Sequence, residues 1–267
     1  MKRCSCTASF ALQPGQFLHR SSGLFVDKTL IYERYDQFVH PSWSVPPTES
    51  EYKTWSRQAR HRFAELLPSN LRSRILDLAC GPGHFLYFLT ERGFENVRGV
   101  DNCGGAVTRA KRMSLPAEKA DILSFLKISQ EQFDCITALD IIEHLTEQQA
   151  GDLFTLIRRR LNPGGTVIFQ TINGESPWCQ SYFASDPTHE TLFTPRSLRS
   201  LLGLAGFSDV VVREVVPPPG PVKFLPRYYA WKVLRLLYAT LNFIETGAGV
   251  SGVYSRNFLL RATLPPR

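Results

Sequence analysis

The sequence predicts an α/β fold with a doubly wound, mostly parallel sheet, and three observations lead to this prediction. Between residues 74 and 171, short apolar runs alternate with amphipathic stretches that have helical spacing. A Gly-Pro-Gly turn at 81–83 separates an expected strand from the helix after it, and an Asn-Pro-Gly-Gly turn at 162–165 separates an expected helix from the next strand. The length of 267 residues and the apolar content of 43% are sufficient for one enlarged domain with a substantial core.

The N-terminal residues 1–47 are expected to form a helical arm outside the core. They contain few periodic apolar positions and end in a proline-rich segment. Their aromatic residues, among them Tyr32, Tyr35 and Trp43, can either anchor the arm to the body or close over a ligand. The folded domain is expected to span 48–267.

The elements of this domain follow from periodicity and from caps. A first helix is expected at 48–67, with Thr48 as its N-cap. The core at 73–173 is expected to hold strands at about 74–79, 96–101, 116–120, 133–139 and 164–171. The helices between and after these strands are expected at about 84–92, 104–113, 121–127 and 146–161.

The remaining residues are expected to complete a seven-stranded sheet. A long loop at 172–193 leads into a helix that begins at Thr194-Pro195 and ends near Gly206. Strands are expected at about 209–215 and 254–263. Between them, a helical insertion at 223–245 has one face with Arg227, Trp231, Lys232 and Arg235 and another with Tyr229, Val233, Leu236, Leu237, Leu241 and Ile244. Two interpretations of this helix stay open: it packs on the sheet, or it lies at an interface near lipid or a lipid-linked substrate.

Composition excludes several classes of protein. The net charge is +7, but the positive excess lies in residues 1–72 and 174–267, without dense Lys/Arg runs, so nucleic-acid binding is not expected. No apolar run approaches the roughly 18 residues of a membrane span. The six cysteines form no Cys-x-x-Cys pair, which favours reduced thiols of a cytoplasmic protein and predicts no metal site.

A ligand site is predicted at the carboxyl ends of the first two strands. Gly81 and Gly83 let the backbone adopt positive φ and let a ligand approach closely, and Asp101 at the end of the second strand can accept hydrogen bonds from both hydroxyls of a ribose. A dinucleotide fingerprint would have a third glycine where Leu86 stands. Asp77 would repel a pyrophosphate and attract an ammonium group. The residues therefore favour a nucleoside with a cationic end.

Five segments together resemble the motifs of class I S-adenosylmethionine-dependent methyltransferases. They are DLACGPGHF (77–85), VRGVD (97–101), KADIL (119–123), FDCITALDIIEHL (133–145) and LNPGGTVIFQT (161–171). The segment THETLFTPRSLRSLLGLAGF (188–207) is similar to the tail of the branch that includes ubiquinone-biosynthesis-like enzymes and methyltransferases of bacterial glycans and natural products. The resemblance implies a Rossmann-like sheet and S-adenosylmethionine as cofactor.

The resemblance also implies roles for individual residues. The cofactor-binding residues would be Asp77, Gly81, Gly83, Asp101, Asp121, Ile122, Leu139 and Asp140. Asp77 and the two glycines would surround the methionine part and Asp101 would bind the ribose. Asp121 and Ile122 would flank the adenine, while Leu139 and Asp140 would lie beside the methionine amine and the sulfonium.

The function expected from this resemblance is O-methylation of a small-molecule or saccharide acceptor, lipid-linked acceptors included. His189 and His144 are the candidate bases for the acceptor hydroxyl, because histidine titrates near neutral pH. The loop at 172–193 and the helix at 223–245 would lie on the acceptor side. Two alternatives stay open: a noncatalytic nucleoside-binding partner of the same fold, and an NAD-dependent oxidoreductase, which Leu86 and Asp77 disfavour.

Overall fold

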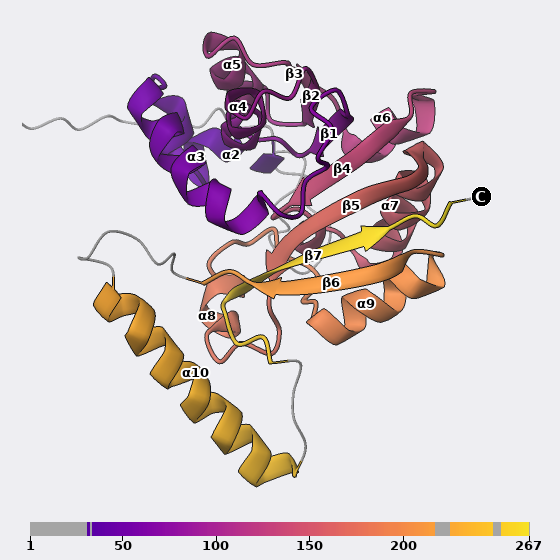
Figure 1. Ribbon diagram of the computed structural model, residues 1–267. Helices are drawn as coiled ribbons and strands as arrows, with labels where there is room; N and C mark the ends of the chain where they lie inside the picture. The colour runs from indigo at the N-terminus through magenta and orange to yellow at the C-terminus, as the bar shows by residue number, and fades with distance from the viewer. Residues whose placement is uncertain (1–30, 33, 217–224, 248–251, 267) are drawn as a thin grey trace, which may run out of the picture.

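The computed structural model describes residues 31–32, 34–216, 225–247 and 252–266, and it confirms the predicted sheet (Figure 1). The strands are β1 (Arg74–Leu78), β2 (Asn96–Asp101), β3 (Ala117–Lys119), β4 (Phe133–Leu139), β5 (Leu161–Ile172), β6 (Ser208–Glu214) and β7 (Asn257–Thr263). Their order is β3-β2-β1-β4-β5-β7-β6. The first five strands are parallel to one another, whereas β7 pairs antiparallel with both β5 and β6.

Helices cover both faces of the sheet. The helices of the central unit are α3 (Glu49–Phe63), α4 (His84–Glu91), α5 (Gly104–Arg112), α6 (Ile122–Ile128), α7 (Glu147–Arg160) and α9 (Pro195–Leu204). Leu76 and Ile136 belong to a cluster with side chains of α7 and α9, whereas their neighbours Ile75 and Cys135 belong to a second cluster with α3 and α4. Because successive strand residues point to opposite faces, each strand contributes to two apolar layers.

The caps that the sequence predicts are present. Thr48 caps α3, and Thr146 forms a capping box with Gln149 at the start of α7. Three expected boundaries are wrong. Helix α3 ends at Phe63 and not near residue 67, β5 begins at residue 161 and not at 164, directly after α7, and β7 begins at residue 257 and not near 254. The backbone N–H of Leu161 donates to the carbonyl oxygen of Ile157. Leu161 is therefore both the C-cap residue of α7 and the first residue of β5.

Three parts of the chain lie outside the layers. The arm contributes α2 (Tyr35–Phe38) and the 3₁₀ helix η1 (Pro41–Ser44); its first 30 residues lie outside the described residues, and the division of the chain at residue 47 stays a prediction. The segment expected as a loop at 172–193 contains the helix α8 (Cys179–Phe183), which corrects that expectation. The insertion forms α10 (Leu225–Thr246), which projects from the body in Figure 1.

Two expectations from composition can be compared with the described chain. Cys80, Cys103, Cys135 and Cys179 are free thiols. Among the residues that the structure describes, no helix combines the length and the apolar content needed to cross a membrane. The cytoplasmic location stays a prediction.

Candidate active site

The glycine turn lies at the carboxyl end of β1, where the backbone takes left-handed conformations. Gly81 has a φ of 52° and Gly83 a φ of 86°, and Ala79 ahead of them is also left-handed, with a φ of 55°. Gly83 is the N-cap residue of α4, so the first N–H groups of that helix face the turn. A non-glycine residue with positive φ is strained, and such strain concentrates at functional sites. The turn is therefore built for a close approach to a ligand.

Asp101 joins this turn to the end of β2. Its Oδ2 accepts a hydrogen bond from the backbone N–H of Gly81 at 2.8 Å, and its Oδ1 accepts one from Cys103 at 2.7 Å. Burial raises the pKa of the Asp101 carboxyl, and these two backbone bonds oppose the rise. Each carboxylate oxygen has a further lone pair, so Asp101 retains the capacity to accept bonds from two ribose hydroxyls.

Asp77 lies beneath the turn, on β1, and is buried. Its Oδ1 accepts a hydrogen bond from Thr137 of β4 at 2.6 Å. Burial raises the pKa of Asp77 to about 7, with a further contribution from the charge of Asp101, while the bond from Thr137 lowers it. A cationic group bound nearby would favour the ionised form, which matches the predicted preference for an ammonium group.

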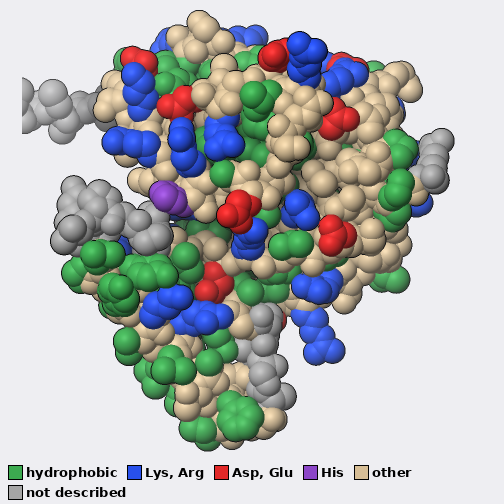
Figure 2. All heavy atoms as spheres, in the orientation of Figure 1, with side chains coloured by type: hydrophobic (Ala, Val, Ile, Leu, Met, Phe, Trp, Pro, Cys, Tyr) green, Lys and Arg blue, Asp and Glu red, His purple; other side chains and the backbone are tan. Residues whose placement is uncertain are grey.

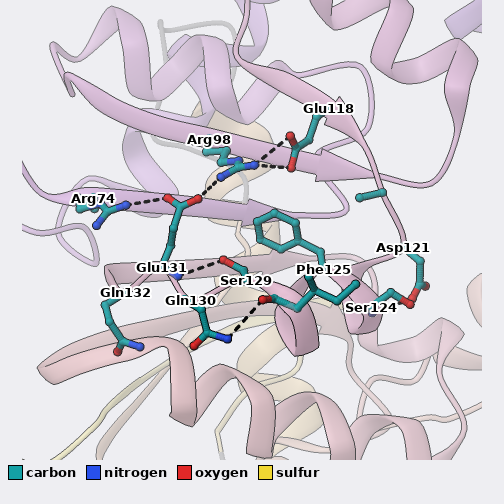
Figure 3. Close-up of a pocket in the computed structure, with 12 residues that line it drawn as sticks. Arg74, Arg98, Glu118, Asp121, Ser124, Phe125, Ser129, Gln130, Glu131 and Gln132 are labelled. Carbon is teal, nitrogen blue, oxygen red and sulfur yellow. Dashed lines mark hydrogen bonds and ion pairs between the residues drawn. The ribbon is translucent and has the colours of Figure 1, made fainter.

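The residues predicted to flank an adenine lie at the start of α6. Asp121 is the N-cap and accepts a hydrogen bond from the backbone N–H of Ser124 at 2.9 Å, while Ile122 is buried in the core. Asp121 also borders an open groove of about 780 Å³ beside α6 (Figure 3). That groove extends to Arg74 at the opposite end of β1, and its charged side chains pair with one another, as in Arg98 with Glu118 at 2.8 Å. The groove is therefore distinct from the predicted ligand site at the glycine turn.

Leu139 and Asp140 lie at the end of β4, next to β1 in the sheet. Asp140 has a φ of 52°, a strained conformation for a residue with a side chain. Its carboxylate accepts a hydrogen bond from Gln170 of β5 at 2.6 Å and another from Asn257 of β7 at 3.0 Å. Leu139 packs against the core cluster that contains α3 and α4. Side chains of β5 and β7 thus hold Asp140 in place at the carboxyl end of β4.

The two candidate histidines come together although 45 positions separate them in the chain. The ring centroids of His144, in the 3₁₀ helix η2 (Ile142–His144), and His189 are 4.6 Å apart. His189 donates from Nδ1 to the carbonyl oxygen of Phe183 at 2.7 Å, so the neutral ring carries its lone pair on Nε2. His144 Nδ1 lies 2.8 Å from the hydroxyl of Thr188.

Glu143 adds a carboxyl to this pair of histidines, and the sequence did not single it out. It is buried and accepts a hydrogen bond from the Thr171 hydroxyl at 2.8 Å. Burial raises its pKa, as does the charge of Asp140. One ligand atom each from Glu143, His144 and His189 lies within 4.8 Å of the others, a donor set that suits a divalent cation. The sequence signal for it was an acidic residue directly before His144 at a strand end.

The arm packs over the glycine turn. Trp43 lies directly over Gly81, where a Cβ atom would be 3.4 Å from the indole, and the Asp36 carboxylate lies against Gly105 at the start of α5. Tyr35 donates a buried hydrogen bond of 2.6 Å to Asp186, three residues before His189. The aromatic residues of the arm therefore anchor it and close it over the predicted ligand site.

A family model described as a methyltransferase domain matches residues 51–212, more than half of the chain. The chain belongs to the class I S-adenosylmethionine-dependent methyltransferases. The match includes the glycine turn, Asp101 and both histidines, and it confirms the resemblance of the five segments. This membership assigns the protein S-adenosylmethionine as cofactor and argues against the NAD-dependent oxidoreductase.

Relatives of this methyltransferase differ in how much of each chain they share with it. An uncharacterised methyltransferase of Synechocystis is 26% identical over 175 residues, which cover 60% of this chain and 81% of that protein. A ubiquinone biosynthesis O-methyltransferase of Rhodopseudomonas palustris is 30% identical over 107 residues, covering 38% of this chain and 40% of that protein. The crystal structure of a SAM-dependent methyltransferase from Archaeoglobus fulgidus has a TM-score of 0.60 at 18% identity and covers 89% of this chain and 100% of that chain. That structural likeness shows the fold alone.

The acidic residues around the glycine turn fit the cofactor of this family in charge and in hydrogen-bonding capacity. Asp101 has further lone pairs that two ribose hydroxyls would use, and the buried Asp77 would favour an ammonium group nearby. The glycines fit through the left-handed backbone of the turn, since the space beside them holds Trp43 at Gly81 and Leu115 and Ala110 at Gly83.

Proposed function

We propose that the enzyme transfers a methyl group from S-adenosylmethionine to a hydroxyl of a small-molecule or saccharide acceptor, including a lipid-linked one. The convergence of His144 and His189 beside the end of β4 carries this proposal. A ring nitrogen of His189 lies within 4.8 Å of a Glu143 carboxyl oxygen, and Glu143 follows Asp140 by three residues, so His189 lies near the end of β4, where the sulfonium is expected. The likeness to a ubiquinone biosynthesis O-methyltransferase supports a hydroxyl acceptor.

In the proposed complex, Asp101 holds the ribose, and Asp77, Gly81 and Gly83 surround the methionine part. Asp121 and Ile122 flank the adenine, and Leu139 and Asp140 lie beside the amine and the sulfonium. S-adenosylmethionine supplies an electrophilic methyl group on a positively charged sulfur. The protein has to align the acceptor oxygen with that group and exclude water.

His189 acts as the general base in this proposal. Its Nδ1 donates to a carbonyl, so Nε2 of the neutral ring is the atom that takes a proton. Asp186, three residues before His189 in the same segment, is the acidic residue proposed to balance the resulting positive charge. Its carboxylate accepts bonds from Thr188 and Tyr35 at 2.6 Å each. Although burial alone would raise the pKa of Asp186, the bonds from Thr188 and Tyr35 hold it below its usual value, so this residue stays ionised.

His144 positions the same region through Thr188. The Thr188 hydroxyl donates to Asp186, so it accepts from His144 Nδ1, and the three groups form a chain. We assign to His144 the orientation of the acceptor and to His189 the proton transfer. The loop at 173–193 supplies both His189 and Asp186 and therefore forms the acceptor side.

The experiment uses methyl-labelled S-adenosylmethionine and pairs of acceptors that differ only by a free hydroxyl or its methyl ether. Candidate pairs are phenols, sugars and polyprenyl-linked sugars. The wild-type enzyme is expected to label the free hydroxyl member of one class, and His189→Ala is expected to reduce that turnover about 10² to 10⁴-fold. His61→Ala, an exposed histidine on α3, is the matched control and should match the wild type. Equal turnover of His189→Ala and the wild type would remove His189 from the mechanism.

A further inference from the structure

The helix α10 has its apolar face turned away from the protein. Its less exposed residues recur every three or four positions and form the stripe that faces the body. They include Tyr228, Trp231, Arg235, Tyr238 and Asn242. The opposite face carries Tyr229, Val233, Leu236, Leu237, Phe243 and Ile244. A helix of a globular protein normally has the reverse arrangement, with apolar residues towards the core.

The exposure of this apolar face is extensive. Val233 and Leu236 are each 69% exposed and Ile244 is 74% exposed, and no described side chain of α10 is buried. Figure 2 shows hydrophobic side chains gathered over the part of the molecule that α10 forms. Single exposed apolar residues are ordinary, but a contiguous patch marks an interaction surface. The interpretation that the helix packs on the sheet is therefore wrong for this face.

Polar and aromatic contacts hold the helix in this orientation. Arg235 forms an ion pair with Glu214 of β6 at 3.0 Å and donates to the carbonyl oxygen of Gly252 at 2.9 Å. Trp178, next to α8 on the acceptor side, contacts the rings of Trp231 and Tyr238, with centroid distances of 6.0 and 5.3 Å. The polar side of the helix is thus fastened to the body, and the apolar side faces outward.

The charges on α10 complement an anionic surface. Arg227 and Lys232 are exposed at the two borders of the apolar face, whereas Glu245 at the C-terminal end is its single acidic residue. Basic side chains at these borders can reach lipid headgroups while their aliphatic parts cover apolar surface. A second copy of the chain would instead bring the same basic borders together, which opposes pairing of two such helices.

We propose that α10 docks the enzyme on an anionic lipid bilayer. The helix lies in the plane of the interface, with Leu236, Val233 and Ile244 in the acyl boundary and Lys232 and Arg227 at the headgroups. Four charged residues along its length suit this position rather than the interior of the bilayer. The contact with Trp178 places the bilayer next to the acceptor side of the site.

The test is flotation of the full chain with vesicles, without cofactor or acceptor. Wild-type protein is expected to float with vesicles of equal parts phosphatidylcholine and phosphatidylglycerol, and several-fold less with phosphatidylcholine alone. The double variant Leu236→Glu with Ile244→Glu should reduce binding to the mixed vesicles by at least about tenfold, and Lys232→Glu should remove the preference for phosphatidylglycerol. Leu204→Glu on α9, at a residue that is 86% exposed, is the matched control and should bind as the wild type does.

Two results would overturn the proposal. One is equal flotation of the double variant and the wild type. The other is a wild-type dimer in light scattering that the double variant abolishes, without vesicle binding, since a second copy would then cover α10. Melting temperature and S-adenosylmethionine affinity should stay unchanged in all variants, because the substituted side chains are exposed. Flotation requires no turnover, so its failure is distinguishable from a failure of the proposed hydroxyl methylation.

Discussion

The backbone N–H of Gly81 donates to Oδ2 of Asp101 across 2.8 Å and so links the glycine turn to the end of β2. The two residues are 20 positions apart in the chain: Gly81 lies in the turn after β1, and Asp101 is the last residue of the neighbouring parallel strand β2. The residue that is proposed to bind the ribose therefore also fixes the turn that is proposed to surround the methionine part. Changes at either place are expected to affect cofactor binding.

Gly83→Ala is expected to destabilise the turn. A Cβ atom there would lie 2.7 Å from Leu115 Cδ1 and 3.0 Å from the Cβ of Ala110, on a backbone with positive φ. We expect the free energy of unfolding to fall by about 1–3 kcal/mol and S-adenosylmethionine affinity to fall with it. Denaturant unfolding and calorimetry measure the two effects. Gly151→Ala in α7, with no atom within 4 Å of the new Cβ, should be neutral or stabilising by up to about 1 kcal/mol, and a similar loss in both variants would contradict the account.

The affinity for S-adenosylmethionine is expected to rise with pH. The pKa of Asp77 without ligand is about 7, and a bound ammonium group favours the ionised carboxylate. Below pH 7 the carboxyl has to lose its proton on binding, which weakens affinity, whereas above pH 7 it is already ionised. Calorimetry should show about a tenfold gain in affinity from pH 6 to pH 8. The Asp77→Asn variant should bind S-adenosylmethionine weakly and with an affinity that does not change with pH. If the variant keeps the pH dependence, the proton that is lost on binding belongs to another group.

Tyr35→Phe is expected to loosen the arm. The substitution removes the hydroxyl and with it the buried hydrogen bond to Asp186. The aromatic ring is unchanged, so its contact with Trp43 is retained. Burial and this bond raise the pKa of Tyr35, so the phenol donates throughout the neutral range. Stopped-flow displacement should show S-adenosylmethionine leaving several-fold faster. Tyr229→Phe on α10 is the control, and equal release rates in the two variants would show that the arm does not retain the cofactor.

Treatment with a chelator distinguishes a mechanism with a histidine base from one that depends on a bound metal ion. The donor set of Glu143, His144 and His189 suits a cation, but the sequence predicts no metal. Since His189 Nε2 can take the proton without a cation, we expect EDTA to leave methyl transfer unchanged. Glu143→Gln should retain most activity, because burial raises the pKa of Glu143 and a neutral amide can still accept from Thr171. Loss of activity that Mg²⁺, Mn²⁺ or Zn²⁺ restores would contradict this expectation.

Local signals predicted the central unit well. Thr146 and Gln149 marked the start of α7, and the alternating apolar residues of β1 and β4 marked strands buried on both faces. These features depend on neighbours within a few positions. Asp77, Gly81 and Asp101 were identified for the same reason, since each stands at the end of a strand or in the turn that follows it.

Long-range contacts could not be predicted in this way. The bond from Tyr35 to Asp186 spans 151 positions, and nothing in either local segment specifies the other. Glu143 was missed because its role depends on His189 folding back onto it. The orientation of α10 could not be predicted either, because the sequence of residues 223–245 shows two different helix faces but does not indicate which of them contacts the rest of the protein. The long-range contacts of Arg235 with Glu214 and of Trp178 with Trp231 and Tyr238 decide that point.

The most direct test of the account is calorimetric titration of S-adenosylmethionine into wild type and Asp101→Ala, with Asp152→Ala on α7 as an exposed acidic control. His189→Ala is titrated alongside. The account predicts that Asp101→Ala loses binding, whereas Asp152→Ala and His189→Ala retain wild-type affinity, all at comparable melting temperatures. Unchanged affinity in Asp101→Ala would contradict the assignment of the crevice at Gly81 and Asp101 as the cofactor site.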